Sequence, residues 1–398
     1  MSELSYLEKL LDGVEVEWVT LGSMADIGTG SSNRQDESEN GIYPFYVRSK
    51  NILKSDTFEF DEVAIVIPGE GGIGDIFHYV EGKYALHQRA YRIRITTNAV
   101  DTKFLYYFMS SSFKQYILTK SVGATAISIR KPMLEGFKVP IPSPDNPEKS
   151  LAIQSEIVRI LDTFTALTAE LTAELTAELN MRKKQYNYYR DQLLSFKEGE
   201  VEWKALEEVS DIYDSLHQTP QYSKNGLSMI RVTDIKNGYI DLKNTLKVND
   251  GIFSIFTKKY LPQKNDLVMS RVGSYGNVGI IPTDNSACMG QNTVVIHPYI
   301  NNRYLFYILT SSIGQDFIEK NVGGGSQKTL SLKSIKSIPI PLTGESEQSK
   351  IVSILDKFDT LTNSITEGLP REIELRQKQY EYYRDLLFSF PKPETVSN

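Results

Sequence analysis

Two pairs of polar residues stand at matching places in the two halves of the sequence. Gln88 and Arg89 directly precede one run of β-branched and aromatic residues, and Gln291 and Asn292 directly precede another. Amide side chains can bond adenine through two hydrogen bonds, and arginine can bond guanine in the same way. Amides in turns also cap backbone groups, so a base-reading role and a structural role are both open.

A glycine-rich loop precedes each pair. Residues 69–74, Gly-Glu-Gly-Gly-Ile-Gly, fit the pattern of dinucleotide-binding loops, but residues 75–80 look extended, so the helix that would hold a pyrophosphate is missing. The counterpart, residues 271–276, keeps two glycines and contains Arg271, Ser274 and Tyr275, which suit contacts to phosphate, sugar or base. We expect a tight turn or a loop against DNA, and regard a nucleotide-dependent enzyme as the minor alternative.

A third pair of loops is rich in small residues. Residues 323–329, Gly-Gly-Gly-Ser-Gln-Lys-Thr, lack the glycine directly before the lysine that a phosphate-binding loop requires. The counterpart, residues 123–126, is followed by Arg130 and Lys131. Both loops suit a close approach to bases and backbone, and a plain surface loop is equally open.

The candidate DNA-contacting residues share polar or basic side chains next to turns and strand ends. They are Arg48, Lys50, Gln88, Arg89, Arg92, Thr125, Arg130, Lys131, Arg231, Arg271, Ser274, Tyr275, Gln291, Asn292, Ser326, Gln327 and Lys328.

Catalytic and metal chemistry have no comparable signal. Cys288 is the only cysteine, and the four histidines are far apart, so we predict neither a disulfide nor a metal site. No adenine-methyltransferase motif, Walker lysine or nuclease cluster stands out, and we expect no catalytic residue. The net charge of −6 predicts weak DNA binding by the chain alone, with partners contributing phosphate contacts. The polar start and the absence of a long apolar run predict a cytoplasmic protein without a membrane span.

The residues above must be positioned by a duplicated framework. Residues 154–196 align without a gap on residues 348–390, and the Gly-Val-Glu-Val-Glu-Trp of residues 13–18 recurs as Gly-Glu-Val-Glu-Trp at residues 199–203. Short runs rich in Val, Ile, Tyr and Phe predict strands in each half, and residues 104–118 and 304–318 predict one helix per half.

Residues 151–196 contain no Gly or Pro and predict one long helix. Three tandem Thr-Ala-Glu-Leu units at its centre keep a leucine at every fourth position. The spacer residues that we assign to this repeat are Thr168, Leu171, Thr172, Leu175, Thr176 and Leu179.

These features predict an α+β fold: two mixed α/β domains separated by two long antiparallel helices, related by a pseudo-twofold axis. We expect the first domain at 1–150, the first long helix at 151–198, the second domain at 199–345 and the second long helix at 346–398. Tyrosines and arginines crowd the far ends of both helices, where they suit either helix packing or docking of a partner subunit. These residues are Tyr186, Tyr189, Arg190, Tyr380, Tyr383 and Arg384.

The chain resembles the specificity subunit of type I restriction-modification systems, and the Thr-Ala-Glu-Leu repeat resembles its IC group. The resemblance rests on that repeat, the paired Gln-Ser-x-Ile-Val segments, the Pro-Ile-Pro exits at 140–142 and 339–341, and Lys-Gln-Tyr-x-Tyr-Tyr-Arg-Asp twice. It implies two target recognition domains that each read half of a bipartite double-stranded DNA target.

As partners it implies two methyltransferase subunits and restriction/translocase subunits. S-adenosylmethionine, ATP and Mg would be used by those partners, and this chain would bind no cofactor. A coiled-coil scaffold that binds only proteins is the alternative from another class.

Overall fold

The computed structural model describes residues 6–72, 74–120, 128–236, 238–325, 327–364 and 366–392. It divides into two compact units. Unit 1 comprises Met1–Thr172 with Leu375–Asn398, and unit 2 comprises Ala173–Glu374. The C-terminal segment therefore belongs with the N-terminal domain.

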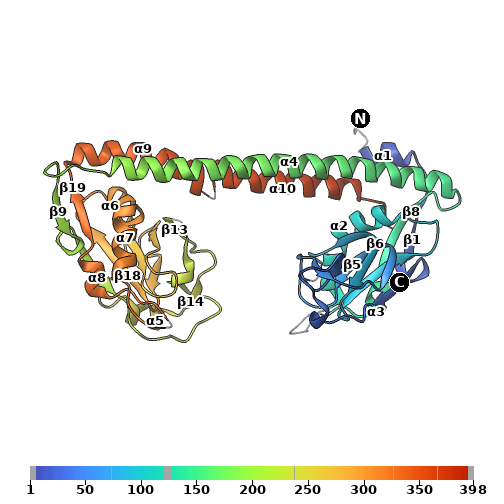
Figure 1. Ribbon diagram of the computed structural model, residues 1–398, viewed down its shortest axis with the longest axis horizontal. Coiled ribbons are helices and arrows are strands. Elements are labelled where there is room, and N and C mark those ends of the chain that lie inside the picture. The colour runs from blue at the N-terminus through green and yellow to red at the C-terminus, as the bar shows by residue number, and fades with distance from the viewer. Residues whose placement is uncertain are drawn as a thin grey trace. The chain divides into compact units, whose positions relative to one another are not determined.

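Unit 1 contains a six-stranded sheet and a separate two-stranded sheet (Figure 1). Its strands are β1 Val16–Thr20, β2 Ala25–Thr29, β3 Tyr43–Tyr46, β4 Leu53–Ser55, β5 Phe60–Pro68, β6 His78–Leu86, β7 Ala90–Ile95 and β8 Lys138–Pro142. Its helices outside the long pair are α1 Tyr6–Leu11, α2 Thr102–Lys120 and α3 Lys131–Glu135. The larger sheet has the order β2-β7-β5-β6-β3-β4, and β1 pairs with β8.

The core of unit 1 lies between the larger sheet and α2. Because successive strand residues point to opposite faces, Ile65 and Ile93 meet Phe104 of α2 on one side of the sheet. The C-terminal segment closes the same core: the ring of Phe388 lies 5.6 Å from that of Phe104, and Trp18 Nε1 donates a 2.8 Å hydrogen bond to the carbonyl of Pro391. Burial of these aromatic rings is the main attachment of the chain end to the first domain.

The described residues of unit 2 form three sheets. Its strands are β9 Glu202–Ala205, β10 Ser210–Asp214, β11 Leu227–Ile230, β12 Ile235–Lys236, β13 Gly238–Ile240, β14 Leu246–Val248, β15 Leu267–Ser270, β16 Val278–Ile280, β17 Ala287–Met289, β18 Thr293–Pro298 and β19 Pro339–Leu342. Its helices outside the long pair are α5 Asp250–Phe256, α6 Asn302–Thr310, α7 Ser312–Asn321 and α8 Leu332–Lys336. The sheet orders are β10-β18-β15-β16-β13-β12, β14-β11-β17 and β19-β9.

Residues 304–318, expected as one helix, form two, α6 and α7. Ser311 between them has an extended backbone, with ψ of 174°. Gly314 then packs so closely that a Cβ atom would lie 2.6 Å from the carbonyl oxygen of Leu309. The first half has lysine at the matching place, Lys114, within the unbroken helix α2. A glycine that permits close approach therefore accompanies the break in the second half.

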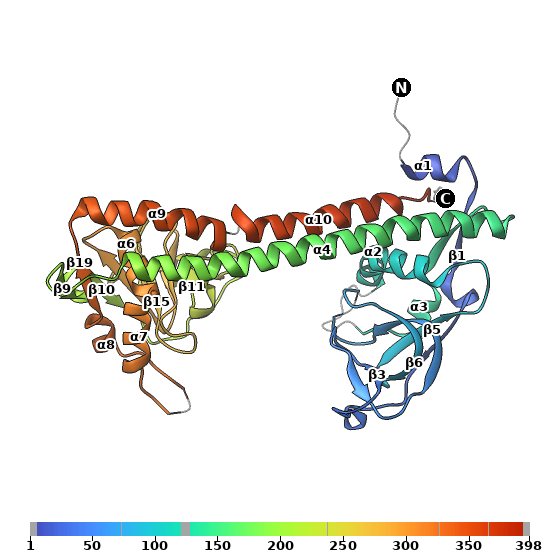
Figure 2. The same cartoon turned by 45° about the horizontal axis from the view of Figure 1, so that its top comes forward.

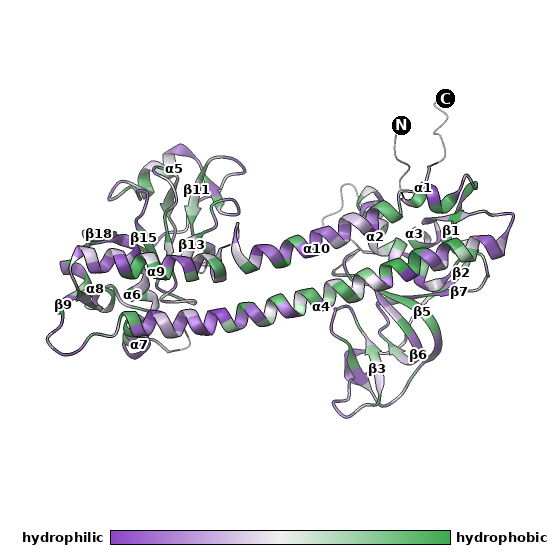
Figure 3. Ribbon diagram, turned by 90° about the horizontal axis from the view of Figure 1, so that it is seen from above, coloured by the Kyte–Doolittle hydropathy of each residue, from purple (hydrophilic) through white to green (hydrophobic). Residues whose placement is uncertain are grey.

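The first long helix, α4, is unbroken from Pro147 to Leu193, 47 residues. At about 1.5 Å per residue it is roughly 70 Å long. Hydrophobic and hydrophilic residues alternate along it (Figure 3), as an amphipathic helix with one packed face requires.

The second long helix differs from the expectation of one rod, because it is divided into α9 Glu345–Asn363 and α10 Gly368–Leu387. Gly368 has a φ of +77°, and a Cβ there would lie 2.5 Å from the carbonyl oxygen of Thr360. Pro370 two residues later cannot donate a backbone hydrogen bond to the preceding turn. The Thr-Ala-Glu-Leu repeat, which keeps α4 regular, has no counterpart at this place.

The long helices are antiparallel within each unit. In unit 1, Ile160 lines a recess with Leu387, and Leu171 lines another with Arg376, so rising numbers on α4 meet falling numbers on α10 (Figure 2). In unit 2, the rings of Tyr189 of α4 and Phe358 of α9 stack with centroids 5.5 Å apart. The predicted fold of two mixed α/β domains with long antiparallel helices is confirmed.

Candidate nucleic-acid interface

Three loops of unit 1 are joined by backbone hydrogen bonds at one end of the larger sheet. The Gly69 amide, after β5, donates to the carbonyl of Arg89 at 2.9 Å, and the Ile129 amide donates to the carbonyl of Gly69 at 2.8 Å. The glycine loop, the β6–β7 turn and the segment after α2 therefore form one surface, which we call the first loop surface.

Unit 2 repeats this connection. The Arg271 amide, after β15, donates to the carbonyl of Asn292 at 2.9 Å, and the Leu330 amide donates to the carbonyl of Arg271 at 2.8 Å. The second loop surface is thus built by the glycine loop, the β17–β18 turn and the segment after α7. The structure confirms that Gln88 and Arg89 occupy the same place in unit 1 as Gln291 and Asn292 occupy in unit 2.

The two glycine loops share their backbone. Gly71 and Gly273 have φ of +68° and +72°, and Gly74 and Gly276 have φ of +74° and +78°. This left-handed region favours glycine. Strand β6, and not a helix, follows residues 69–74 after a short connection, so no helix N-terminus is there to hold a pyrophosphate. Turn geometry accounts for these glycines.

The first loop surface carries a cluster of one carboxylate and two guanidinium groups. Glu70 Oε2 accepts hydrogen bonds from Arg48 Nη1 at 3.1 Å and from Arg89 Nη1 at 3.2 Å. All three side chains are about half exposed, between 45% and 56%. Lys50, Gln88, Arg130 and Lys131 are exposed as well. Beneath them, the buried His87 ring accepts the amide of Arg89 through Nδ1, and burial together with the two nearby arginines lowers the pKa of His87.

The second loop surface has a similar cluster with different side chains. Tyr275 donates its hydroxyl to Glu319 Oε2 at 2.7 Å, and Lys328 Nζ lies 3.3 Å from Glu319 Oε1. Hydrogen bonds from Tyr275 and Lys328 lower the pKa of Glu319. Ser274, Gln291 and Gln327, which belong to the loops of this surface, are exposed. Asn292 adopts a positive φ of +65° at the β17–β18 turn.

The two carboxylates, Glu70 and Glu319, were not among the residues that the sequence singled out. Glu70 lies inside the glycine pattern of residues 69–74. Its place within that loop was the sequence feature that could have indicated it. Glu319 lies on α7, and no sequence feature connects it to Tyr275.

Three arginines predicted to contact DNA have carboxylate partners within their own domain. Arg92 is 13% exposed and pairs with Asp26 at 2.7 Å and with Glu62 at 3.0 Å. Arg271 is 12% exposed and binds both oxygens of Asp214, at 2.7 and 2.8 Å. Arg231 holds Asp234 three residues on, at 2.9 Å. These guanidinium groups meet carboxylates of neighbouring strands or turns and so help to hold the strands and loops in place.

Two further predicted contacts, Thr125 and Ser326, lie outside the described residues.

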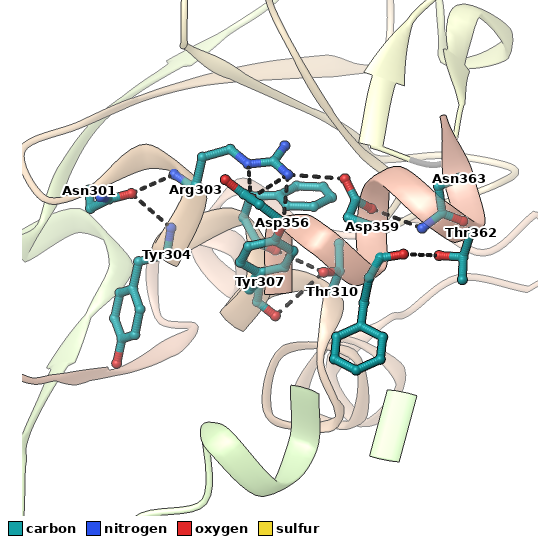
Figure 4. A network of polar contacts seen from close by, with 11 residues as sticks. Asn301, Arg303, Tyr304, Tyr307, Thr310, Asp356, Asp359, Thr362 and Asn363 are labelled. Carbon is teal, nitrogen blue, oxygen red and sulfur yellow. Dashed lines mark hydrogen bonds and ion pairs between the residues drawn. The ribbon is translucent and has the colours of Figure 1, made fainter. Parts of the chain in front are cut away.

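Each domain is attached to a long helix by a polar network. In unit 2, Arg303 Nε donates to Asp356 Oδ1 at 2.8 Å, and Arg303 Nη2 donates to Asp359 at 3.0 Å (Figure 4). Tyr307 donates its hydroxyl to Asp356 at 2.5 Å. In unit 1, Lys103 and Tyr107 both bond Asp162, each at 2.7 Å. The network therefore recurs and holds each mixed α/β domain to its helix.

A buried glutamine adds to each attachment. Gln154 of α4 accepts the amide of Asp101 at 2.8 Å and donates to the carbonyl of Ala99 at 3.0 Å. Gln348 of α9 accepts the amide of Asn301 at 3.3 Å and donates to the carbonyl of Thr343 at 2.7 Å. This explains the paired glutamine motif, because an unpaired buried amide would be costly.

The aromatic residues of the helix ends divide into buried and exposed groups. Tyr186 is only 6% exposed and packs in the core of unit 2. Tyr189 and Tyr383 are 45% and 42% exposed. Tyr380 is half-buried and accepts a hydrogen bond from Thr165 at 3.1 Å. Arg190 and Arg384 pair with the aspartates that follow them, at 3.1 and 2.8 Å.

The Thr-Ala-Glu-Leu residues lie within the unbroken α4. Leu171, Leu175 and Leu179 are half-buried, while the alanines of the repeat are exposed. Thr168 and Thr172 are half-buried and Thr176 is exposed. The repeat thus keeps one packed edge, as its period predicted.

Among the residues that the structure describes, no helix combines the length and the apolar character needed to cross a membrane. The His, Cys, Asp and Glu side chains described form no group of three able to hold a metal ion.

Comparison with known proteins identifies the family. Residues 13–181 and 198–375 match the model of the type I restriction modification DNA specificity domain. The specificity subunit of the Escherichia coli type I restriction enzyme EcoR124I/EcoR124II is 40% identical over 420 residues, covering 100% of both chains. That of the E. coli enzyme EcoprrI is 35% identical over 406 residues, covering 92% of this chain and 93% of the relative.

The fold also has a solved counterpart. A chain from a structural study of complex assembly and conformational transition of the type I R-M system superposes with a TM-score of 0.58 at 14% identity, covering 94% of this chain and 97% of that chain. The family match favours DNA recognition over a scaffold that binds only proteins. This chain belongs to the type I restriction-modification DNA specificity family and is a DNA-recognition subunit, not a catalytic one.

Proposed function

We propose that each domain reads one half of a bipartite double-stranded DNA target through its loop surface. The observation that carries this proposal is the repeated backbone connection of Gly69 with Arg89 and of Arg271 with Asn292. The same pair of backbone hydrogen bonds frames different side chains, an arginine cluster in one domain and Tyr275 with Lys328 in the other. Two domains that recognise different DNA sequences require a shared backbone arrangement with different side chains, since base contacts depend on side-chain donors and acceptors.

Positively charged residues around the frame would hold the phosphate backbone. Lys50, Arg130 and Lys131 are exposed on or beside the first loop surface. Phosphate contacts position a protein on the duplex, while groups such as Gln88 and Gln291 would specify the bases. Because the chain carries a net charge of −6, partner subunits would add further phosphate contacts.

The helix α4 would set the distance between the two half-sites. One Thr-Ala-Glu-Leu unit adds about 6 Å of helix and roughly 40° of rotation. Since each base pair advances duplex DNA by about 3.4 Å, one unit corresponds to about one to two base pairs of spacer.

The exposed aromatic residues of the helix ends would bind other subunits of the system. Tyr189 and Tyr383 present half-exposed rings, and exposed aromatic residues favour protein interfaces. We propose two methyltransferase subunits as the partners, with restriction/translocase subunits joining the assembly in the cytoplasm. S-adenosylmethionine, ATP and Mg would bind those partners and not this chain.

The proposal is tested by sequencing methylated adenines in cells that carry the chain with its partner subunits. A Gln88→Ala, Arg89→Ala variant should relax the methylated motif in its first half only. A Gln291→Ala, Asn292→Ala variant should relax the second half only. If either variant altered both halves equally, or if both left the motif unchanged, the assignment of one loop surface to each half-site would be wrong.

A further inference from the structure

Each loop surface contains an exposed carboxylate between two side chains that are candidates for DNA contact. Glu70 receives hydrogen bonds from Arg48 and Arg89 on the same oxygen, Oε2. Glu319 receives the Tyr275 hydroxyl and lies 3.3 Å from Lys328. The arrangement occurs independently in two domains whose side chains otherwise differ.

Stability of the fold does not explain these carboxylates. The side chains of Glu70 and Glu319 are 45% and 61% exposed. Exposed ion pairs contribute little to stability, because water and salt screen them and two long side chains must be ordered. Arg92 and Arg271, by contrast, form their pairs where they are nearly buried.

Affinity for DNA does not explain them either. A carboxylate close to a duplex repels phosphates, so a protein selected only for tight binding would not place one between its cations. This repulsion increases specificity when it weakens binding to an incorrect DNA sequence more than binding to the correct one, since specificity is a difference between two affinities. A fixed guanidinium or hydroxyl also reads a base edge better than one that can follow any nearby phosphate.

We propose that Glu70 and Glu319 are specificity-determining residues that fix their neighbouring side chains for base recognition and weaken binding to non-cognate DNA. Glu70 positions Arg48 and Arg89 for the first half-site. Glu319 positions Tyr275 and Lys328 for the second. The inference rests on the proposed function and adds that recognition uses acidic residues as well as basic ones.

The experiment compares Glu70→Gln and Glu319→Gln in the complex of the full chain with its methyltransferase subunits. Glutamine keeps the shape of glutamate and removes its charge. Binding of duplexes with a correct target, a first-half mismatch or a second-half mismatch is measured at one salt concentration. For Glu70→Gln, the ratio of correct to first-half-mismatched affinity should fall about tenfold, the scale of one base-reading contact, chiefly because the mismatched duplex binds more tightly. Glu319→Gln should do the same for the second half only.

Glu347→Gln is the matched control. Glu347 is 50% exposed and lies 3.3 Å from Lys350 on α9, away from both loop surfaces in the chain. This variant should leave both ratios unchanged. Thermal unfolding of all three variants verifies that they remain folded, and Glu70→Asp, which keeps the charge, should recover part of the first-half discrimination.

Two results would overturn the inference. One is an unchanged ratio in Glu70→Gln and Glu319→Gln while the Gln88→Ala, Arg89→Ala variant still relaxes its half-site, which leaves the proposed function intact. The other is an equal loss of affinity for correct and mismatched duplexes, which would make the carboxylates supports of the loops only.

Discussion

The hydroxyl of Tyr307 donates a 2.5 Å hydrogen bond to Asp356, and this bond fastens α6 of the second domain to α9. Tyr307 is fully buried, and burial together with Asp356 raises the pKa of its hydroxyl. Because a hydrogen bond to a charged group contributes about 1.5–3 kcal/mol, Tyr307→Phe should lower the free energy of unfolding by about that amount. Denaturant titration measures it.

The counterpart in the first domain provides a second measurement. Tyr107 bonds Asp162 at 2.7 Å, so Tyr107→Phe should destabilise unit 1 to a similar degree. Tyr188, which is 61% exposed, serves as the control, and Tyr188→Phe should have little effect. Equal stability of all three variants would show that the hydroxyl bonds do not hold the domains to the helices.

Deleting one repeat unit, residues 176–179, should shorten the unread spacer of the DNA target by about one to two base pairs. Both half-sites should stay the same, because the loop surfaces are untouched. Replacing the same four residues by alanine keeps the helix length and should leave the spacer unaltered. Methylated-adenine sequencing reads both outcomes, and an unaltered spacer after the deletion would contradict the role of α4.

Alanine substitutions of the loop glycines should differ in severity. At Gly74, φ is +74° and an added Cβ would lie 2.7 Å from the Cα of Lys114, so the backbone itself must move. At Gly71, φ is +68° and no atom lies within 4 Å, so only the backbone strain of about 1–2 kcal/mol remains.

We therefore expect Gly74→Ala to reduce first-half recognition and thermal stability more than Gly71→Ala. At Gly276 the nearest atoms are side-chain ends of Ile318 and Gln315, at 3.2 and 3.4 Å, and Gly276→Ala should be milder than Gly74→Ala. Melting temperatures and duplex binding rank the three variants. The reverse order would mean that contact with α2 does not shape the loop.

Acid should weaken the first domain through Asp26. The hydrogen bond from Arg92 holds the pKa of Asp26 below its ordinary value of 3.8. A carboxyl with a lowered folded-state pKa stabilises the fold above its unfolded pKa, and the contribution is lost as the pH falls through the folded value. Asp26→Asn should therefore be less stable than the parent chain at neutral pH and lose less stability on acidification. Unfolding free energies from neutral pH to about pH 3 check this, and parallel curves for both chains would refute it.

The partners of Arg92 also show where sequence patterns stop being informative. Its type and its place beside a predicted strand suited phosphate binding, yet β7 lies between β2 and β5, which bring Asp26 and Glu62 to its guanidinium. Arg271 meets Asp214 of β10 although β18 separates their strands. Strand order decides such pairs, and no local pattern in the sequence contains it.

The sequence by itself determined the duplication, the unbroken α4 with its repeat, and the glycine turns of the two loops, because periodicity and backbone freedom are local properties of residue types. Only the tertiary structure decided that Tyr186 is buried, that Gly368 accompanies a break between α9 and α10, and that Glu70 and Glu319 stand between candidate DNA contacts. These depend on which segments, distant along the chain, come within a few ångströms of each other.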